Sequence, residues 1–253
     1  PTAGLSKIAT LIQRERMGSG NSETVLVDAG DTLYSYATDF FYNYNDKLIQ
    51  PIYQAMAMLD YDAITLGNHE LDFPWEYLTN QLMESGLYPV TTVANLRHDV
   101  TGEEILPPSI VTEKMIEMSD GTVKKLRIGI VGATRQSIST KRQRYSGFLC
   151  GTDIYEAVKE EATRLKEDGV DVVIALIHGG IGLKDSTTTV SPGAKLAQLS
   201  VIDAVVTSHT HEEFPMDTDK YKGYKYVDEE MGLIHGKPVI AVGSHAENLG
   251  VIE

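Results

Sequence analysis

Short apolar runs recur along this chain of 253 residues, and polar residues follow most of them directly. Five of these runs are rich in β-branched and small apolar side chains, which is typical of strands buried inside a sheet. They span residues 24–27, 63–66, 90–94, 172–177 and 204–207. Each run therefore predicts a strand whose carboxyl end presents polar side chains.

Stretches with helical periodicity lie between these runs. The clearest places Ile154, Val158 and Leu165 on one face, which is the pattern of an amphipathic helix. The predicted helices cover residues 4–16, 48–59, 75–85 and 154–166. Because helices alternate with strands along the chain, the sequence predicts an α/β fold.

Two further apolar runs, residues 109–117 and 126–131, flank the turn signal Ser119-Asp120-Gly121-Thr122. This arrangement predicts a hairpin, so part of the sheet should be antiparallel. The sequence contains no internal repeat, low-complexity tract or long Pro/Gly/Ser linker that would divide it. We therefore expect one domain over residues 1–253.

Composition narrows the class of protein. Hydrophobic residues make up 42% of the chain and charged residues 23%, and the longest apolar runs are far shorter than the roughly 20 residues of a membrane span. The formal net charge of -14 repels a polyanionic backbone, so we exclude DNA and RNA polymers as partners. A small phosphorylated substrate stays compatible with this charge, because a bound divalent cation reverses the local field.

Five candidate metal ligands follow the predicted strands: Asp31, Asn68, His178, His209 and His211. Because the carboxyl ends of parallel strands meet at one edge of a sheet, we expect these side chains to lie together. Oxygen and imidazole ligands without thiolate suit Zn²⁺ or Mn²⁺, with Fe, Co and Ca²⁺ as alternatives. Two such cations about 3.5–4 Å apart can hold a hydroxide in line with a phosphoryl group. The sequence therefore predicts hydrolysis of a phosphate ester.

Each of these residues also has a plain structural role to set against the metal site. Asp31 could complete a turn, and Asn68 could cap a helix or adopt a left-handed conformation. Asp72 stands just before Phe73-Pro74-Trp75 and could start a helix, because Pro and acidic residues both favour the first turn. We favour the metal site because the motifs occur together in one chain.

Four motifs occur in order: Gly30-Asp31, Gly67-Asn68-His69-Glu70, His178-Gly179-Gly180 and Ser208-His209-Thr210-His211. In this order they resemble the motifs of the calcineurin-like metallophosphoesterases. Residues 52–56, 61–62 and 68–72 are similar to the pattern of the 5′-nucleotidase group within that superfamily. The resemblance narrows to the bacterial 2′,3′-cyclic-nucleotide 2′-phosphodiesterase and 3′-nucleotidase branch at residues 211–215, 236–238 and 249–252. It covers nearly the whole chain.

The resemblance implies a four-layer α/β/β/α sandwich of two mixed sheets flanked by helices, with the metal site at the carboxyl ends of the strands. It also implies two divalent cations, with Asp31 as the ligand that bridges them. The implied ligands of one cation are Asn68, His178 and His209, and His211 binds the other.

The implied catalytic dyad is His69 and Asp72. His69, held by the Asp72 carboxylate, would stabilise charge on the phosphate or protonate the leaving oxygen. The carboxylate would also keep the imidazole in the useful tautomer. Asn95 follows another predicted strand, and we expect it to support the metal shell through a hydrogen bond.

Three details lie outside the motifs. Ser208 stands where the family has Gly, and His245 lies in a segment that differs from the family pattern, so we give it no predicted role. Residues 34–44 are rich in aromatic side chains. These could stack on a nucleobase, but aromatic residues more often fill a core or a lid, and we expect packing.

The predicted activity is metal-dependent hydrolysis of nucleotide phosphoesters, with 2′,3′-cyclic nucleotides and 3′-nucleotides favoured. The alternative substrates are 5′-nucleotides and nucleotide sugars, as in a 5′-nucleotidase or UDP-sugar hydrolase. A catalytically silent phosphate-binding module is an alternative of another class. It is motivated by the family's opening Asp-x-His motif, which is missing ahead of Pro1 and which serves the cation that His211 contacts. Without these two ligands that cation should bind weakly.

The resemblance also implies a setting for the protein. Relatives are usually exported to the periplasm, the cell wall or the medium, although this chain shows no signal peptide. They carry a C-terminal substrate-binding domain, which would begin after Glu253. We therefore expect a nucleotide or another small phosphoester as the ligand.

Overall fold

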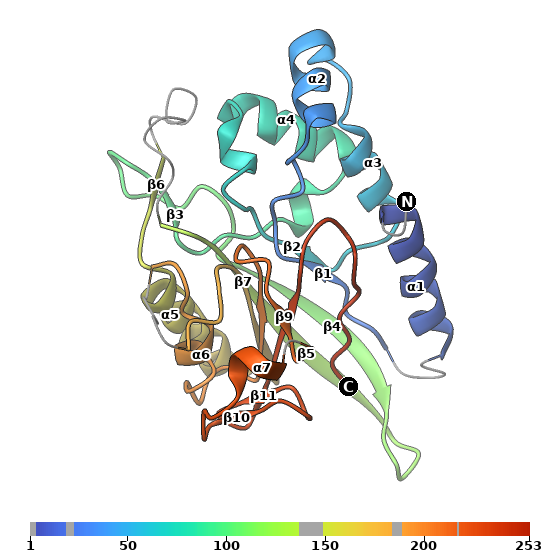
Figure 1. The fold of residues 1–253 in the computed structure, drawn as a ribbon, viewed down its shortest axis with the longest axis vertical. Coiled ribbons are helices and arrows are strands. Elements are labelled where there is room, and N and C mark those ends of the chain that lie inside the picture. Colours follow the sequence, from blue (N-terminus) through green and yellow to red (C-terminus); the bar gives the residue numbers. More distant parts are fainter. Residues whose placement is uncertain (1–3, 19–22, 137–148, 184–188, 217) are drawn as a thin grey trace.

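A large mixed sheet lies at the centre of the computed structural model, which describes residues 4–18, 23–136, 149–183, 189–216 and 218–253 (Figure 1). Its strands are β4 (Ser109–Glu117), β5 (Val123–Thr134), β7 (Val172–His178), β8 (Ala204–Thr207), β9 (Glu213–Phe214), β10 (Val227–Asp228), β11 (Leu233–Ile234) and β12 (Lys237–Val242). The order is β10-β11-β12-β8-β7-β5-β4, with β9 paired to β12. The central strands β12, β8, β7 and β5 are parallel, whereas β4 and β11 are antiparallel to their neighbours.

The predicted hairpin is confirmed by β4 and β5, which pair from Ser109 opposite Val131 to Glu117 opposite Val123. The turn between them is fixed by the Asp120 carboxylate, which accepts a hydrogen bond of 2.9 Å from the Thr122 N–H. The first residues of β5 are exposed and its last seven are buried. The hairpin therefore projects from the body of the protein at one end and enters the core at the other (Figure 1).

A second sheet packs against the first. It consists, among the described residues, of the parallel pair β1 (Val27–Asp28) and β2 (Ala63–Ile64), with a single bridge from Ile64 to Thr91. The resemblance implies two mixed sheets, and this second sheet is smaller than expected and parallel in its described part. A separate antiparallel pair is formed by β3 (Leu96–His98) and β6 (Leu149–Gly151).

The strand predicted over residues 90–94 is wrong. Its backbone instead donates alternately to different partners: Thr92 N–H to the Ile64 carbonyl and Ala94 N–H to the Gly132 carbonyl, at 2.9 and 2.8 Å. Ile64 belongs to the small sheet and Gly132 to the large one. The segment therefore joins the two sheets and cannot extend the ladder of either, although its burial gives it the composition of a strand.

The helices are α1 (Leu5–Gly18), α2 (Tyr36–Asn45), α3 (Pro51–Ala57), α4 (Trp75–Ser85), α5 (Ile154–Glu167), α6 (Gly193–Leu196) and α7 (Thr218–Tyr221), with short 3-10 turns η1 (Glu70–Asp72) and η2 (Tyr88–Val90). The helices predicted near the N-terminus and over residues 75–85 and 154–166 are confirmed. The one predicted over 48–59 is shorter, because Pro51 fits the first turn but has no N–H to continue a helix before it.

The hydrophobic pattern does not predict α2, which has only one buried residue. Ser35 caps it, with its hydroxyl accepting from the Thr38 N–H and the Thr38 side chain accepting from the Ser35 N–H. Tyr36, Phe40 and Tyr44 are exposed along this helix. The expected packing is therefore wrong for these three side chains, whereas Tyr42 of the same helix packs against Phe73 and Tyr77.

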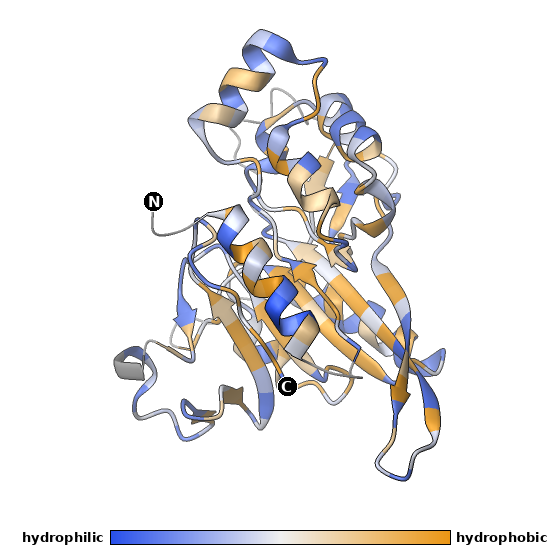
Figure 2. Ribbon diagram, turned by 90° about the vertical axis from the view of Figure 1, so that its right-hand side faces the viewer, coloured by the Kyte–Doolittle hydropathy of each residue, from blue (hydrophilic) through white to orange (hydrophobic). Residues whose placement is uncertain are grey.

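Two neighbouring residues of β2 show how the layers stack. Ala63 points toward the large sheet, where it packs with Ile128 and Leu176, whereas the next residue, Ile64, packs among side chains of α3 and α4. The other face of the large sheet packs on α5. The layers are thus α5, the large sheet, the small sheet, and α3 with α4, which confirms the α/β/β/α arrangement. Figure 2 shows the mainly apolar strands between more polar helices.

Every helix in the described part of the chain is too short or too polar to cross a membrane.

Candidate metal centre

The candidate ligands come from the ends of parallel strands in both sheets. His178 is the last residue of β7, and His209 lies two residues beyond β8. Asp31 and Asn68 lie in the loops that follow β1 and β2. The two sheets face each other, so their carboxyl ends bring these loops together across the layer boundary.

Three of the predicted ligands converge on one point. The ligand atoms of Asp31, His178 and His209 all lie within 4.8 Å of one another. Asp31 Oδ2 is 3.1 Å from His178 Nε2, and this nitrogen is 3.2 Å from His209 Nδ1. One carboxylate oxygen and two imidazole nitrogens around a common point are the donor set that Zn²⁺ or Mn²⁺ prefers.

The proton of His178 is fixed on the far side of its ring. Nδ1 lies 2.8 Å from the Ala29 carbonyl oxygen, which can only accept a hydrogen bond. Nδ1 therefore carries a proton, and Nε2 is the nitrogen that faces Asp31 Oδ2. Ser208 reinforces this arrangement, because its hydroxyl donates to the same carbonyl at 3.0 Å. Once Nε2 has lost its own proton, an imidazole held in this way presents the lone pair of that nitrogen to a metal.

Asn68 also fits a cation. Its Oδ1 atom is buried and has no hydrogen-bond partner within the described part of the chain. Buried polar atoms are nearly always hydrogen-bonded, so an orphaned amide oxygen needs an explanation. A cation bound beside Asp31 would satisfy it.

Two glycines let the loops of Asp31 and Asn68 touch. A Cβ on Gly67 would lie 2.2 Å from Asp31 Oδ1, and one on Gly30 would lie 2.3 Å from the Gly67 nitrogen. Both contacts are far shorter than real side chains allow. The same approach lets the His69 N–H donate to Asp31 Oδ1 at 2.8 Å, so glycine is required at both positions.

Glu70 holds the loop of Asp31 and the loop of Asn68 together, a role that the sequence pattern did not predict. Its buried carboxylate accepts three backbone N–H groups, from Asp31 at 2.8 Å, Gly67 at 2.7 Å and Leu33 at 2.7 Å. Burial and the charge of Asp31 raise its pKa, while these donors act in the opposite direction. The sequence offers one sign of this role: Glu70 stands inside a motif and is followed by the apolar residue Leu71, which is typical of a buried segment.

The predicted dyad is brought together. His69 Nδ1 lies 2.8 Å from Asp72 Oδ2, and His69 Nε2 points toward the cluster, 4.0 Å from Asp31 Oδ2. The ring of Tyr34 stacks on His69 with centroids 4.0 Å apart and planes at 24°. The imidazole is thus held by a carboxylate at Nδ1 and by an aromatic ring on its face.

The remaining candidates lie outside the cluster. His211 is exposed, and its ring centroid is 6.2 Å from that of His245. Asn95 is buried, and its side chain bonds the backbone of Thr134 and Thr152. These bonds hold the end of β5, and none that the structure describes reaches a candidate ligand directly.

The electrostatics shift the pKa values of the three cluster residues in different directions. Burial raises the pKa of Asp31, but the hydrogen bond and charge of His178 outweigh it and hold that pKa below its ordinary value. Burial lowers the pKa of His178, and the same contact with Asp31 raises it above its ordinary value. Burial, with the positive charges of His178 and Arg135, lowers the pKa of His209 to about 4. His209 is therefore neutral near pH 7.

Arg135 is a second residue that the sequence analysis missed. Its Nη1 lies 2.8 Å from His209 Nε2, on the side of the ring away from His178. It is the first residue after β5, whose strand was predicted to end at Val131. The candidate ligands are polar residues that directly follow a buried strand. Arg135 meets the same criterion once the strand is taken to end at Thr134.

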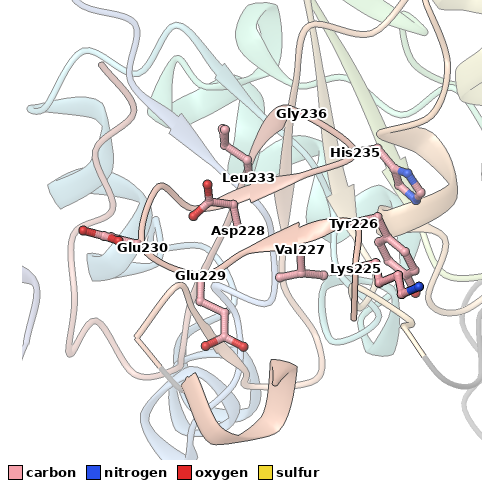
Figure 3. A pocket seen from close by; sticks show the side chains of 9 residues that line it. All are labelled: Lys225, Tyr226, Val227, Asp228, Glu229, Glu230, Leu233, His235 and Gly236. Carbon is pink, nitrogen blue, oxygen red and sulfur yellow. The ribbon is translucent and has the colours of Figure 1, made fainter. Parts of the chain in front are cut away.

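A hollow of about 740 Å³ lies elsewhere, at the β10–β11 hairpin (Figure 3). Acidic side chains on its rim, Glu229 and Glu230, point in different directions. None of the candidate site residues lines it. It therefore gives no support to a second site for the predicted chemistry.

Comparisons with known proteins agree with this geometry. No family model matches the chain. The trifunctional nucleotide phosphoesterase protein YfkN of Bacillus subtilis is 32% identical over 267 residues, which cover 99% of this chain and 17% of that protein. The 2′,3′-cyclic-nucleotide 2′-phosphodiesterase/3′-nucleotidase of Yersinia enterocolitica is 30% identical over 256 residues, 99% of this chain and 38% of that protein. The chain thus spans well under half the length of these relatives.

The crystal structure of calcineurin-like phosphoesterase YfkN from Bacillus subtilis superposes with a TM-score of 0.87 at 29% identity, covering 97% of this chain and 75% of that one. Fold, motif order and these relatives together place the chain in the calcineurin-like metallophosphoesterase superfamily. Within it, the chain belongs to the group that contains the 5′-nucleotidases and the 2′,3′-cyclic-nucleotide 2′-phosphodiesterases. A fold of this class carries a divalent-metal site, and the cluster of Asp31, His178 and His209 lies where one is expected.

Proposed function

We propose that residues 1–253 form the catalytic domain of a metal-dependent phosphoesterase that prefers 2′,3′-cyclic nucleotides and 3′-nucleotides. The observation that carries the proposal is the convergence of Asp31, His178 and His209 beside the orphaned oxygen of Asn68. Relatives at 30–32% identity are named for these activities or as a trifunctional nucleotide phosphoesterase. 5′-Nucleotidases match at lower identity, and 5′-nucleotides are therefore the second candidate substrates.

The proposed ligands divide between two cations. Asp31, Asn68, His178 and His209 hold one, and His211 with Asp31 contributes to the other. Zn²⁺ or Mn²⁺ suits the nitrogen and oxygen donors. Bound there, the cations supply an activated water and neutralise charge on the phosphoryl oxygens.

His69 and Asp72 act on the leaving group. The hydrogen bond to the Asp72 carboxylate places a proton on His69 Nδ1, and a protonated ring then presents its Nε2–H toward the cluster. From there it donates to the leaving oxygen or to charge that develops on the phosphate. Tyr34, stacked on one face of the ring, restricts its rotation.

The proposal extends to the setting of the domain. The relatives are longer than this chain, and we place a substrate-binding domain in the additional length of the same polypeptide. We also propose that the protein acts outside the cytoplasm, as an exported enzyme. In this arrangement the second domain binds the nucleoside part of the substrate, and this domain binds the phosphate.

A hydrolysis assay tests the proposal. The chain is stripped with EDTA, reloaded with Mn²⁺ or Zn²⁺, and assayed with 2′,3′-cyclic AMP, 3′-AMP, 5′-AMP and UDP-glucose. We expect release of phosphate from 3′-AMP and ring opening of the cyclic substrate, both lost on chelation and restored by metal.

Asp31→Asn is the matched negative control, since it keeps the shape of the side chain and removes its charge. Turnover that survives chelation, or that Asp31→Asn leaves intact, would overturn a metal-dependent mechanism. Binding of Mn²⁺ and phosphate without turnover of any of the four substrates would indicate the silent module instead.

A further inference from the structure

Arg135 projects into the candidate metal centre from a firmly held backbone. The residue before it, Thr134, pairs with His178 at the end of the β5–β7 ladder. Asn95 holds the same residue by accepting from its N–H at 2.9 Å and donating to its carbonyl at 2.6 Å. The guanidinium therefore starts from a fixed point beside the ligands.

The guanidinium has little to bind in the structure. Its Nη1 contacts His209 Nε2 at 2.8 Å, while its Nε is buried and has no hydrogen-bond partner among the residues that the structure describes. No ion pair between Arg135 and a carboxylate of the described residues is present, although the chain carries 36 acidic side chains. A buried guanidinium N–H without an acceptor is unfavourable, and an anion that entered the site would satisfy it.

The contact with His209 is incompatible with a filled cation site. Arginine only donates, so His209 Nε2 must accept, and a neutral ring then carries its proton on Nδ1. Nδ1 is the nitrogen that faces His178 Nε2 at 3.2 Å, where the ligands converge. When Nδ1 serves as a ligand, the proton of the neutral ring resides on Nε2. The Nε2–H of His209 and the Nη1–H of Arg135 are then two donors that face each other. Arg135 must then turn to another acceptor.

We propose that this acceptor is the phosphoryl group of the substrate, so that Arg135 is a phosphate-binding residue of the site. The inference rests on the proposed function, since it takes the substrate to be a phosphoester. A planar guanidinium offers parallel N–H groups that match two phosphoryl oxygens. Arg135 would thus bring a permanent positive charge to this cluster, in a chain whose formal net charge is -14.

The proposal predicts a difference between substrates. A 3′-nucleotide carries a terminal phosphate with up to two negative charges, whereas a 2′,3′-cyclic phosphate carries one. Loss of the guanidinium charge should therefore raise KM for 3′-AMP more than KM for 2′,3′-cyclic AMP. A residue with a merely structural role would affect both equally.

Isothermal titration calorimetry with inorganic phosphate tests the proposal without turnover. Mn²⁺-loaded wild type is compared with Arg135→Gln and Arg135→Lys. Arg97→Gln is the matched control, because Arg97 pairs with Glu104 at 3.4 Å on the surface and lines no candidate site. We expect Arg135→Gln to weaken phosphate binding by at least about tenfold, the effect of one charge-assisted hydrogen bond. Arg135→Lys should lose less, and Arg97→Gln should match wild type.

Titration with Mn²⁺ alone completes the experiment. We expect Arg135→Gln to bind Mn²⁺ as tightly as wild type or more tightly, because a competing cation beside His209 has been removed. Phosphate affinity within twofold of wild type in Mn²⁺-loaded Arg135→Gln overturns the proposal. Loss of Mn²⁺ binding in that variant also overturns it, because Arg135 would then support His209. If phosphate binding depends on Arg135 but no nucleotide is hydrolysed, the proposed function fails and the phosphate site stands.

Discussion

The two sheets place their ligands in different ways. His178 ends a strand of seven residues that is paired on both sides, so its position follows from two hydrogen-bonded ladders. Asp31 follows a strand of only two residues, and its loop is held by the Glu70 carboxylate. The large sheet positions a ligand with backbone, whereas the small sheet relies on one buried side chain. Stability and metal affinity should therefore be separable by mutation on the first side and inseparable on the second.

The largest expected effect is on the side of the ladders. Leu176 is fully buried in β7, where it packs with Ala63 and Ile130 between the sheets. We expect Leu176→Ala to lower the free energy of unfolding by about 2–5 kcal/mol, as cavities in cores do. Mn²⁺ affinity of the folded protein should stay close to wild type, since both ladders remain. Urea unfolding and calorimetry measure the two quantities.

Val111→Ala is the control for this variant, because Val111 is exposed on strand β4 of the same sheet. It should change stability by about 0.5 kcal/mol or less. A loss below about 1 kcal/mol in Leu176→Ala would show that the layer boundary is loosely packed.

The next effect lies on the side of the loops. Glu70→Gln puts an amide NH₂ among three backbone N–H donors, and at least one of them loses its acceptor. We expect unfolding free energy to fall by about 1–3 kcal/mol. Unlike Leu176→Ala, this variant should also lose Mn²⁺ affinity, because the loop of Asp31 is released.

Glu76→Gln makes the same chemical change at an exposed position in the first turn of α4 and should leave both measurements unchanged. If Glu70→Gln lost stability but kept full Mn²⁺ affinity, the two sides of the site would not differ as described.

A smaller effect should appear in turnover alone. Asp72→Asn removes the charge that faces His69 Nδ1 at 2.8 Å but keeps an oxygen in place. We expect kcat to fall about ten- to hundredfold, part of what general acid catalysis contributes. Mn²⁺ affinity should not change, since Asp72 is not among the proposed ligands. Steady-state kinetics and a Mn²⁺ titration measure these two effects. A rise in KM without a fall in kcat would contradict the role of Asp72.

The smallest effect concerns the ring on His69. Tyr34→Leu removes a stacked contact with a centroid distance of 4.0 Å, worth about 0.5–1.5 kcal/mol for aromatic pairs. We expect kcat to fall about two- to tenfold. Tyr34→Phe keeps the ring and should behave as wild type. Equal losses in both variants would point to the hydroxyl instead of the stack.

Predictability from sequence follows the same division. The α/β class, the hairpin, and α5 could be predicted because regular periodicity marks long elements packed on one face. The segment over residues 90–94 could not, because burial on both sides gives a bridge between sheets the composition of a strand. Helix α2 could not be predicted either, because Tyr36, Phe40 and Tyr44 are exposed and the start of the helix depends on the Ser35 cap.

The site shows a similar limit. Residues that directly follow predicted strands, such as His178, were found by position in the sequence. Arg135 was missed because the predicted strand ends at Val131, three residues before the observed end of β5 at Thr134. Glu70 was passed over as a ligand because its role is to accept backbone N–H groups from residues 31, 33 and 67. Such contacts exist only once the loops have come together in three dimensions.

The segment over residues 91–94 also bears on how the protein opens. Because the Thr92 N–H donates to Ile64 of one sheet and the Ala94 N–H donates to Gly132 of the other, the two sheets cannot separate without breaking backbone hydrogen bonds of this segment. The two sheets should therefore open as one cooperative unit. In native-state hydrogen exchange, the amides of Thr92 and Ala94 should exchange with the slowest group, at the free energy of global unfolding. Amides of the projecting end of the hairpin should exchange far earlier.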